Sequence, residues 1–267
     1  MKSFLLFIAL HISFLGYSQT TLVSWNMENF GKSKSAYCID FMANTLKEFD
    51  IIAVVEVVAG PGGAQAVAKL TDELNRKGSK WDYRISDPTF SSAFKTERYA
   101  FIWKTSKVKL KGKPWLEQKY KLEIEREPYF ATFEIDGKTI TIGAFHAITK
   151  NKKPENEIKY FSYFPLEYPK LNFIFAGDFN CPQSNLSFDG LKKMGYSPIL
   201  INQKTSLKQK CVVNDCLASE FDNMFYSTSK IKVRQKGVIS FYKSFSTLKE
   251  AKTISDHLPI WMEFSLQ

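Results

Sequence analysis

The feature that most constrains the fold is the segment Ile51–Val58, which is apolar at every position except Glu56. Its β-branched residues favour a strand, and a strand without polar alternation has to be covered on both faces. The segment therefore predicts a buried strand in a layered fold. Burying an unpaired carboxylate is costly, so we expect Glu56 to meet a cation or a cluster of hydrogen-bond donors.

Other apolar runs bounded by turn residues predict further strands, and three stretches have apolar residues at helical spacing. The expected strands are residues 22–25, 83–85, 99–103, 129–135, 139–145, 172–176, 223–226 and 258–264. The expected helices are residues 37–48, 64–76 and 154–164. No repeat or linker interrupts the series, so we predict one domain over residues 20–267, with a two-layered sheet core flanked by helices.

The first 19 residues have the pattern of a secretory signal peptide. Lys2 precedes an apolar stretch over residues 4–15, which is too short to span a membrane as a helix. We expect residues 1–19 to be removed and the mature protein to be secreted or periplasmic. No cysteine lies near the expected cleavage site, so no membrane anchor is expected there.

Four cysteines, Cys38, Cys181, Cys211 and Cys216, remain after that cleavage. An even number in an exported chain favours disulfides, and four cysteines allow three complete pairings. Cys211 and Cys216 are close enough in sequence to close a small loop, but the sequence does not choose among the pairings. No Cys-x-x-Cys pair is present, which argues against a zinc ribbon.

The charge balance favours an anionic partner. The chain has 37 Lys and Arg against 27 Asp and Glu, which gives a formal charge of +10. Such a chain suits nucleic acid, phosphorylated small molecules or an acidic lipid surface.

Polar residues stand at the ends of several of the apolar strands. Each one alone is more typical of a turn or a helix cap than of a catalytic site. As a set they combine carboxylate, amide and imidazole groups, which are the groups used for metal binding and for acid–base catalysis. The set is Asn26, Glu56, His146, Asp178, Asn180, Asp256 and His257.

The motifs around these residues resemble those of the endonuclease/exonuclease/phosphatase superfamily, and within it those of deoxyribonuclease I. The most specific are Gly-Asp-Phe-Asn at residues 177–180 and Ser-Asp-His at residues 255–257. Thr-Glu-Arg-Tyr at residues 96–99 and Arg-Glu-Pro-Tyr at residues 126–129 resemble the deoxyribonuclease I branch. The resemblance implies a four-layered α/β sandwich, with two packed, mainly antiparallel sheets flanked by helices.

The resemblance also implies a role for each site residue. His146 and His257 would flank the scissile phosphate, oriented by Glu97 and Asp222 respectively, and Asp178 is an alternative group for activating the water. The identity of the general base stays open. The implied catalytic residues are His146, His257, Asp178, Asp222 and Glu97. The implied metal ligands are Asn26, Glu56, Asp178, Asn180 and Asp256. The implied substrate-binding residues are Arg126, Asn180 and Thr205.

Hard oxygen ligands of this kind suit Mg²⁺, and Mn²⁺ accepts similar ligands. The sequence does not choose between one and two ions. The cysteine pair and acidic loop that hold structural Ca²⁺ in some relatives are not recognisable ahead of Arg126, so we do not expect Ca²⁺. The expected partner is DNA, contacted through its phosphate backbone, and the expected state is a monomer.

Two positions depart from the deoxyribonuclease I pattern. Glu28 and Val58 stand where the resemblance places basic side chains that enter the minor groove. The lysines of residues 104–121 and 150–153 either replace those contacts or form an ordinary solvated surface.

The leading interpretation is an exported metal-dependent endonuclease that hydrolyses DNA with low sequence specificity. The alternative keeps the fold but acts on lipid or small-molecule phosphates, as a sphingomyelinase does. An inactive binding module is disfavoured, because every residue of the strand-end set is retained.

Overall fold

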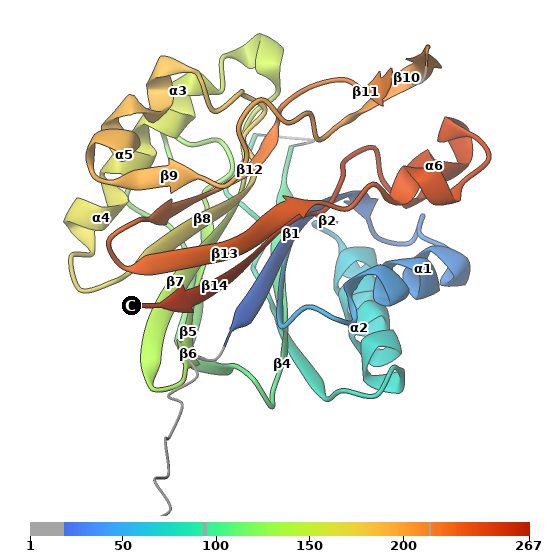
Figure 1. Ribbon diagram of the computed structural model, residues 1–267, viewed down its shortest axis with the longest axis horizontal. Coiled ribbons are helices and arrows are strands. Elements are labelled where there is room, and N and C mark those ends of the chain that lie inside the picture. The colour runs from blue at the N-terminus through green and yellow to red at the C-terminus, as the bar shows by residue number, and fades with distance from the viewer. Residues whose placement is uncertain (1–18, 93–94, 214) are drawn as a thin grey trace, which may run out of the picture.

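The computed structural model describes residues 19–92, 95–213 and 215–267 (Figure 1). Apart from Gln19, the expected signal peptide lies outside the described residues. The described residues form two six-stranded sheets and one separate two-stranded hairpin. No helix within these ranges combines the length and apolarity needed to cross a membrane.

The first sheet has its strands in the order β13, β14, β1, β2, β4, β3. Their bounds are Ile231–Val238, Ile260–Leu266, Thr20–Phe30, Ile51–Val58, Glu97–Lys104 and Trp81–Ile85. Only the pairing of β1 with β2 is parallel in this sheet, within the described residues. The strand predicted for residues 22–25 is longer than expected and continues through Asn26.

The second sheet has its strands in the order β5, β6, β7, β8, β12, β9. Their bounds are Lys109–Leu116, Tyr129–Ile135, Lys138–His146, Phe173–Asp178, Asp222–Ser227 and Tyr196–Pro198. Here β7 and β8 form a parallel pair, and antiparallel pairs surround them. Asp136 and Gly137 both have positive φ and form the tight turn between β6 and β7, as such a pair favours.

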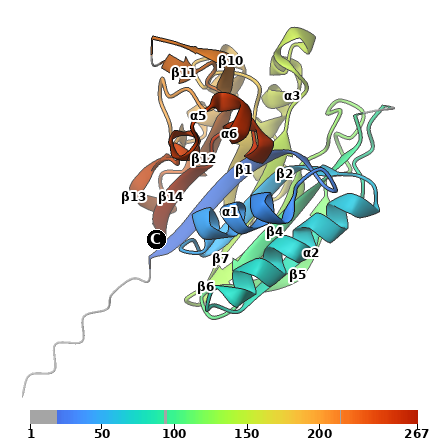
Figure 2. The same ribbon diagram turned by 90° about the vertical axis from the view of Figure 1, so that its right-hand side faces the viewer.

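Helices cover the outer faces of both sheets (Figures 1 and 2). Against the first sheet lie α1 (Ala36–Leu46), α2 (Pro61–Arg76), the 3-10 turn η4 (Phe241–Ser244) and α6 (Leu248–Ile254). Against the second sheet lie the short helices α3 (Glu155–Ile158), α4 (Phe164–Glu167) and α5 (Asp189–Lys193), and the 3-10 turns η2 (Lys159–Ser162) and η3 (Leu186–Phe188). A further turn, η1 (Lys150–Lys152), precedes α3. The expected four-layered sandwich is confirmed.

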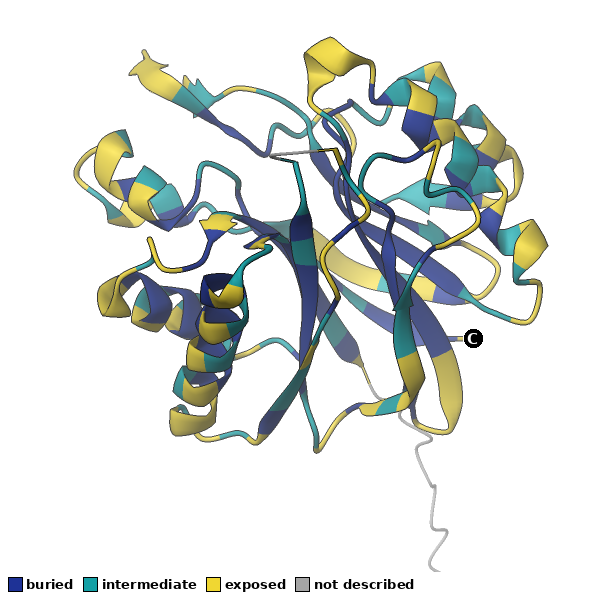
Figure 3. Ribbon diagram, turned by 180° about the vertical axis from the view of Figure 1, so that it is seen from behind, coloured by how far each residue is buried: buried dark blue, intermediate teal, exposed yellow. Residues whose placement is uncertain are grey.

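Three apolar clusters hold the layers together. One fills the space between the two sheets and includes Leu22, Tyr99 and Phe133. The second joins the first sheet to its helices around Trp25, and the third joins the second sheet to its helices around Phe161. Both faces of each central strand are therefore covered, as the apolar Ile51–Val58 segment required (Figure 3).

The prediction of one continuous helix over residues 154–164 is wrong. The chain forms α3, then η2, and then starts a new helix at Phe164. Pro165 lacks the backbone N–H that a continuous helix would donate to the carbonyl of Phe161, so a new helix starts here with the proline in its first turn. Ile158 and Phe161 nevertheless point into the core, as expected.

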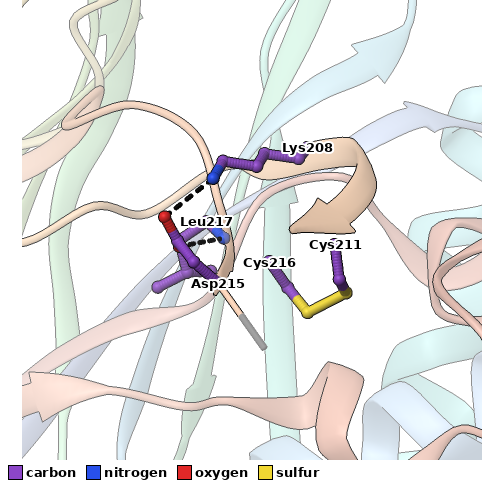
Figure 4. Close-up of a disulfide and its surroundings, with 5 residues drawn as sticks. All are labelled: Lys208, Cys211, Asp215, Cys216 and Leu217. Atoms are coloured by element: carbon purple, nitrogen blue, oxygen red, sulfur yellow. Dashed lines mark hydrogen bonds and ion pairs between the residues drawn. A yellow bond between two sulfur atoms is a disulfide. The ribbon is translucent and has the colours of Figure 1, made fainter. Parts of the chain in front are cut away.

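The cysteine pairing is now settled for one pair. Cys211 and Cys216 form a disulfide that closes the hairpin of β10 (Leu207–Val212) and β11 (Asp215–Leu217) (Figure 4). Cys38 and Cys181 are buried free thiols.

Candidate active site

The sheets bring the predicted polar residues to one end of the sandwich. Asn26 and Glu56 lie on the parallel strands β1 and β2, and His146 and Asp178 end the parallel strands β7 and β8. The carboxyl ends of parallel strands meet at the same edge of a sheet, so their polar residues cluster there. His257 precedes β14, which runs antiparallel to β1 and so begins at the same end.

A cleft of about 790 Å³ opens at this end between the two sheets. Nine of the residues predicted from the sequence line it: Asn26, Glu56, Glu97, Arg126, His146, Asp178, Asn180, Asp256 and His257. Asp222 and Thr205 are buried beneath the cleft instead. The lining also contains Lys152, one of the lysines considered for phosphate contacts, and Glu28, Lys95 and Thr149, which were not predicted as site residues.

The first histidine is held by a carboxylate and a guanidinium. His146 Nδ1 lies 2.9 Å from Oε2 of Glu97, and Arg126 Nη1 donates to that same oxygen at 3.0 Å. Arg126 Nη2 donates to the carbonyl of Ala147, and its buried Nε has no partner among the described residues. Two nitrogens of the guanidinium thus donate hydrogen bonds within the protein, although Arg126 was predicted to bind phosphate.

The second histidine is held by a carboxylate and a hydroxyl. His257 Nδ1 lies 2.8 Å from Oδ2 of Asp222, and the Thr205 hydroxyl donates to that oxygen at 2.7 Å. The Thr205 hydroxyl also accepts a hydrogen bond from the backbone N–H of Asp222 at 2.9 Å.

Thr205 therefore differs from its predicted role. It is fully buried, and Asp222 lies between it and His257, so its hydroxyl cannot reach a phosphate in the cleft. The structure places it as a residue that orients the His257–Asp222 pair. In the sequence, Thr205 is only a threonine in a polar segment, and no pattern there indicates that its hydroxyl contacts Asp222.

Asp178 lies between the two histidines. Its Oδ2 is 3.5 Å from Nε2 of His146 and 3.6 Å from Nε2 of His257. The side-chain amide of Asn26 donates to Oδ2 at 3.1 Å, and the backbone of Asn180 donates to Oδ1 at 2.8 Å. Both imidazoles thus present their free nitrogen to one oriented carboxylate.

Glycine is required next to Asp178. Gly177 has a φ of +148°, and a methyl group there would collide with the carbonyl oxygen of Phe145 on β7. The close approach of the β7 and β8 backbones therefore accounts for the glycine of the Gly-Asp-Phe-Asn motif.

The charges in the cleft shift the pKa values of these groups. Burial lowers the pKa of both histidines, but carboxylates outweigh it. Glu97 raises the pKa of His146 above its usual value while Arg126 opposes the rise, and Asp222 and Asp178 raise the pKa of His257 well above its usual value. Burial would raise the pKa of Asp178, yet the two histidines hold it below its usual range. The carboxylates thus favour the charged form of each imidazole, and the histidines favour the ionised form of Asp178.

Three further carboxylates, those of Glu28, Glu56 and Asp256, line the cleft. Glu56 Oε1 accepts from the backbone N–H of Asn29 at 2.9 Å, and Glu28 Oε2 accepts from that of Asp256 at 3.0 Å. Burial and the neighbouring Asp256 and Glu56 raise the pKa of Glu28. Carboxylates gathered in this way, in a cleft that Asn26 and Asn180 also line, fit a hard divalent cation.

Asp178, Asp222 and His257 also form a cluster whose ligand atoms lie within 4.8 Å of one another. Asp222 and His257 are already hydrogen-bonded to each other, and Thr205 occupies the same carboxylate oxygen. This cluster is therefore better described as an acid–base pair beside Asp178 than as a cage for an ion.

Comparisons with known proteins extend over most of the chain. The chain is 24% identical over 260 residues to a pig protein named deoxyribonuclease-1-like 1, covering 91% of this chain and 80% of the relative. It is 23% identical to a deoxyribonuclease from Thioalkalivibrio sp. (strain K90mix), covering 91% of this chain and 70% of the relative.

Among solved structures, the human Nocturnin catalytic domain with a bound sulfate superposes with a TM-score of 0.67 at 14% identity, covering 93% of this chain and 95% of that domain. That likeness shows a shared fold. The model of the Endonuclease/Exonuclease/phosphatase family matches residues 23–257, a span that contains both histidines and every described carboxylate of the cleft. The chain therefore belongs to the endonuclease/exonuclease/phosphatase family.

Proposed function

We propose that this protein is an exported, metal-dependent endonuclease that hydrolyses DNA with low sequence specificity. The observation that carries the proposal is the pair of carboxylate-held histidines whose Nε2 atoms both face Asp178, in a cleft that Glu28, Glu56 and Asp256 also line. Two relatives named as deoxyribonucleases support the choice of DNA.

The reaction is an in-line attack of water on the phosphodiester. A proton has to leave the attacking water and another has to reach the leaving alkoxide. The two Nε2 atoms are the groups placed to move these protons, because Glu97 and Asp222 fix both Nδ1 atoms. Asp178 is placed to orient the water or to stabilise whichever imidazole becomes charged.

The cation proposed for this site is Mg²⁺, with Mn²⁺ as a substitute. Glu56 and Asp256 would hold it together with the oxygens of Asn26, Asp178 and Asn180, all of which line the cleft. When bound, such an ion neutralises charge on the phosphoryl oxygens and on the leaving oxygen. Ca²⁺ is not part of the proposal.

Plasmid nicking tests the proposal. Mature protein is incubated with supercoiled DNA and Mg²⁺, Mn²⁺ or a chelator, beside His257→Ala and the matched surface variant Lys232→Ala. Lys232 pairs with Ser265 at the far end of β14 from His257. We expect metal-dependent nicked and linear products from the wild type and Lys232→Ala only. Absence of cleavage with either metal contradicts the proposal.

A second candidate function is hydrolysis of lipid or small-molecule phosphates in the same cleft. Glu28 favours it, because an acidic side chain lines the cleft where a nuclease of this kind would use a basic one. Turnover of phosphorylcholine esters, without plasmid cleavage by the same preparation, would select this candidate.

Export and the monomeric state are also proposals. N-terminal sequencing of the protein recovered outside the cytoplasm should begin near residue 20. Light scattering on the mature protein should give the mass of one chain.

A further inference from the structure

The β10–β11 hairpin stands out from the body of the molecule on the active-site side (Figures 1 and 3). Its base is bonded to the segment that carries His257. Ser206 and His257 form a β-bridge, and the backbone N–H of Leu207 donates to the carbonyl of Asp256 at 2.7 Å. The hairpin is therefore an arm attached directly to the catalytic strand end.

The end of this arm is apolar and strained. Val212 is 60% exposed and Val213 is 95% exposed. Val213 also has a φ of +47°, in the left-handed region that a β-branched residue rarely adopts. The disulfide between Cys211 and Cys216 holds this end closed (Figure 4). Val212 pairs with Asp215, so Val213 lies in the hairpin turn, which accounts for its positive φ. Its exposed apolar side chain is not needed for that turn and is free to make a contact outside the fold.

Lysines surround the apolar end. Lys204 and Lys208 both contact Oδ2 of Asp215, at 3.3 and 2.7 Å, and the pKa of Asp215 is lowered to about 2 by those contacts. Lys210 is exposed and has no ion-pair partner among the described residues. The arm therefore carries two ammonium groups, with Lys204 beside it, against the one carboxylate of Asp215, which complements a polyanion.

We propose that this hairpin is an arm that grips duplex DNA beside the phosphate being cleaved, with its lysines against the backbone and its valines in a groove. The inference rests on the proposed nuclease function. Glu28, Glu56 and Asp256 make part of the cleft acidic and only two lysines, Lys95 and Lys152, line it, so lysines beside the cleft would add contacts to flanking phosphates. A two-stranded ribbon fits the width of the major groove. Two valines offer too little apolar surface to hold a membrane alone.

The first test replaces Val213 by Asn, which accepts a positive φ more readily and removes the apolar contact. We expect the melting temperature to rise by about 2 °C. We expect kcat/KM on duplex DNA, relative to kcat/KM on bis(p-nitrophenyl) phosphate, to fall about fivefold. A merely structural hairpin would lose no DNA activity in a variant that folds at least as well.

The second test changes the charge in both directions. Lys208→Ala with Lys210→Ala should raise KM for duplex DNA and reduce the slope of log KM against log salt by about 1 to 2. Asp215→Asn releases Lys204 and Lys208 from their ion pairs and should lower KM. Lys232→Ala is the matched control and should leave the DNA slope unchanged.

The third test removes the cross-link with Cys211→Ser and Cys216→Ser. The expected result is a higher KM for duplex DNA, because an open arm has to be ordered on binding. The same result is expected when the wild type is treated with a reductant.

The outcomes separate this inference from the proposed function. If the wild type cleaves DNA and none of the arm variants changes KM, the arm does not grip DNA. If the wild type cleaves no DNA, the proposed function fails first. If Val213→Asn instead abolishes binding to vesicles containing phosphatidylserine, the arm contacts a lipid surface and the inference is wrong.

Discussion

The two histidine–carboxylate pairs have nearly the same geometry but different surroundings. Each imidazole is held through Nδ1 and presents Nε2 to Asp178. The His146 pair has a buried cation behind it, Arg126, whereas the His257 pair has the neutral hydroxyl of Thr205. A cation beside a carboxylate reduces how strongly that carboxylate stabilises a protonated imidazole, so it limits the rise in the histidine pKa. A neutral hydroxyl has a much smaller effect on that pKa.

The two imidazoles are therefore not equivalent, although their geometry is similar. Asp178 raises the pKa of both histidines, but Arg126 opposes the rise at His146, whereas the charged groups that act on His257 are the carboxylates Asp222, Asp178 and Asp256. Of the two, His146 is expected to give up its proton more readily. The comparison favours His146 as the proton acceptor and His257 as the proton donor.

The largest expected effect comes from removing either imidazole. His146→Ala and His257→Ala should each lower kcat by about a thousandfold, since each removes a proton-transfer group. Plasmid cleavage gives the rate, and circular dichroism checks that the fold is intact. Near-normal activity in either variant would mean that the two pairs do not share the reaction.

The next largest effect is expected from replacing Glu97 or Asp222, and it distinguishes these two carboxylates. Glu97→Gln and Asp222→Asn should each lower kcat by about a hundredfold, because an amide orients the wrong imidazole tautomer. Their stabilities should differ. Glu97→Gln leaves Arg126 buried without its ion-pair partner and should cost about 3 kcal/mol of unfolding free energy. Asp222→Asn leaves no unpaired cation behind it and should cost about 1 kcal/mol.

Urea unfolding measures that difference. Glu134→Gln is the matched control, because Glu134 pairs with Lys111 at the surface, and it should change neither rate nor stability appreciably. Equal destabilisation by Glu97→Gln and Asp222→Asn would remove Arg126 as the feature that distinguishes the two pairs.

A smaller effect is expected at Thr205. Thr205→Val removes the hydroxyl that holds Asp222 and should lower kcat by about tenfold with little change in KM. Thr205→Ser keeps the hydroxyl and should retain most of the activity. A rise in KM with unchanged kcat would instead return Thr205 to the phosphate-binding role predicted from the sequence.

The smallest effect concerns titration. Replacing Arg126 by Met should raise the pKa of His146 and leave that of His257 nearly unchanged. The chain has three histidines, of which His11 lies in the predicted signal peptide, so NMR of the mature, chelator-treated protein should show two imidazoles. A shift at His257 instead would contradict the pairing.

The same pKa values make stability depend on pH. Folding raises the pKa of His257, so its stabilisation is complete below about pH 6.5 and is lost as the pH rises through the folded-state pKa. Asp222→Asn removes the strongest raising interaction and should reduce the loss of stability between neutral and alkaline pH. Urea unfolding across that range measures it.

The strand-end residues were predictable because they stand as polar residues at the ends of apolar strands and lie in motifs that resemble the family, and the structure shows that two parallel strand pairs bring them to one end. Asn26, Glu56, His146 and Asp178 are brought together in this way. The contacts of Thr205 with Asp222 and of Arg126 with Glu97 were not predictable, because each contact joins segments that are far apart in the sequence. Apolar periodicity contains no information on such contacts.

The edge strands β5 and β13 were not predicted, for a different reason. β5 and β13 are edge strands that carry lysines, and β5 was interpreted only as part of a basic stretch. Exposed lysines protect sheet edges from pairing with other chains, but they also weaken the apolar signal by which a strand is recognised. The break before α4 was missed for a local reason, since Pro165 interrupts an otherwise helical pattern.

His146, Asp178 and Asp222 come from β7, β8 and β12, three adjacent strands whose hydrogen-bonded register pairs Asp178 with both of the others. Spacings fixed by a sheet ladder cannot loosen until the ladder itself opens. On heating, this protein should therefore keep its catalytic power until the whole domain melts. A catalyst assembled from surface loops would fade at lower temperatures, well before its scaffold gives way.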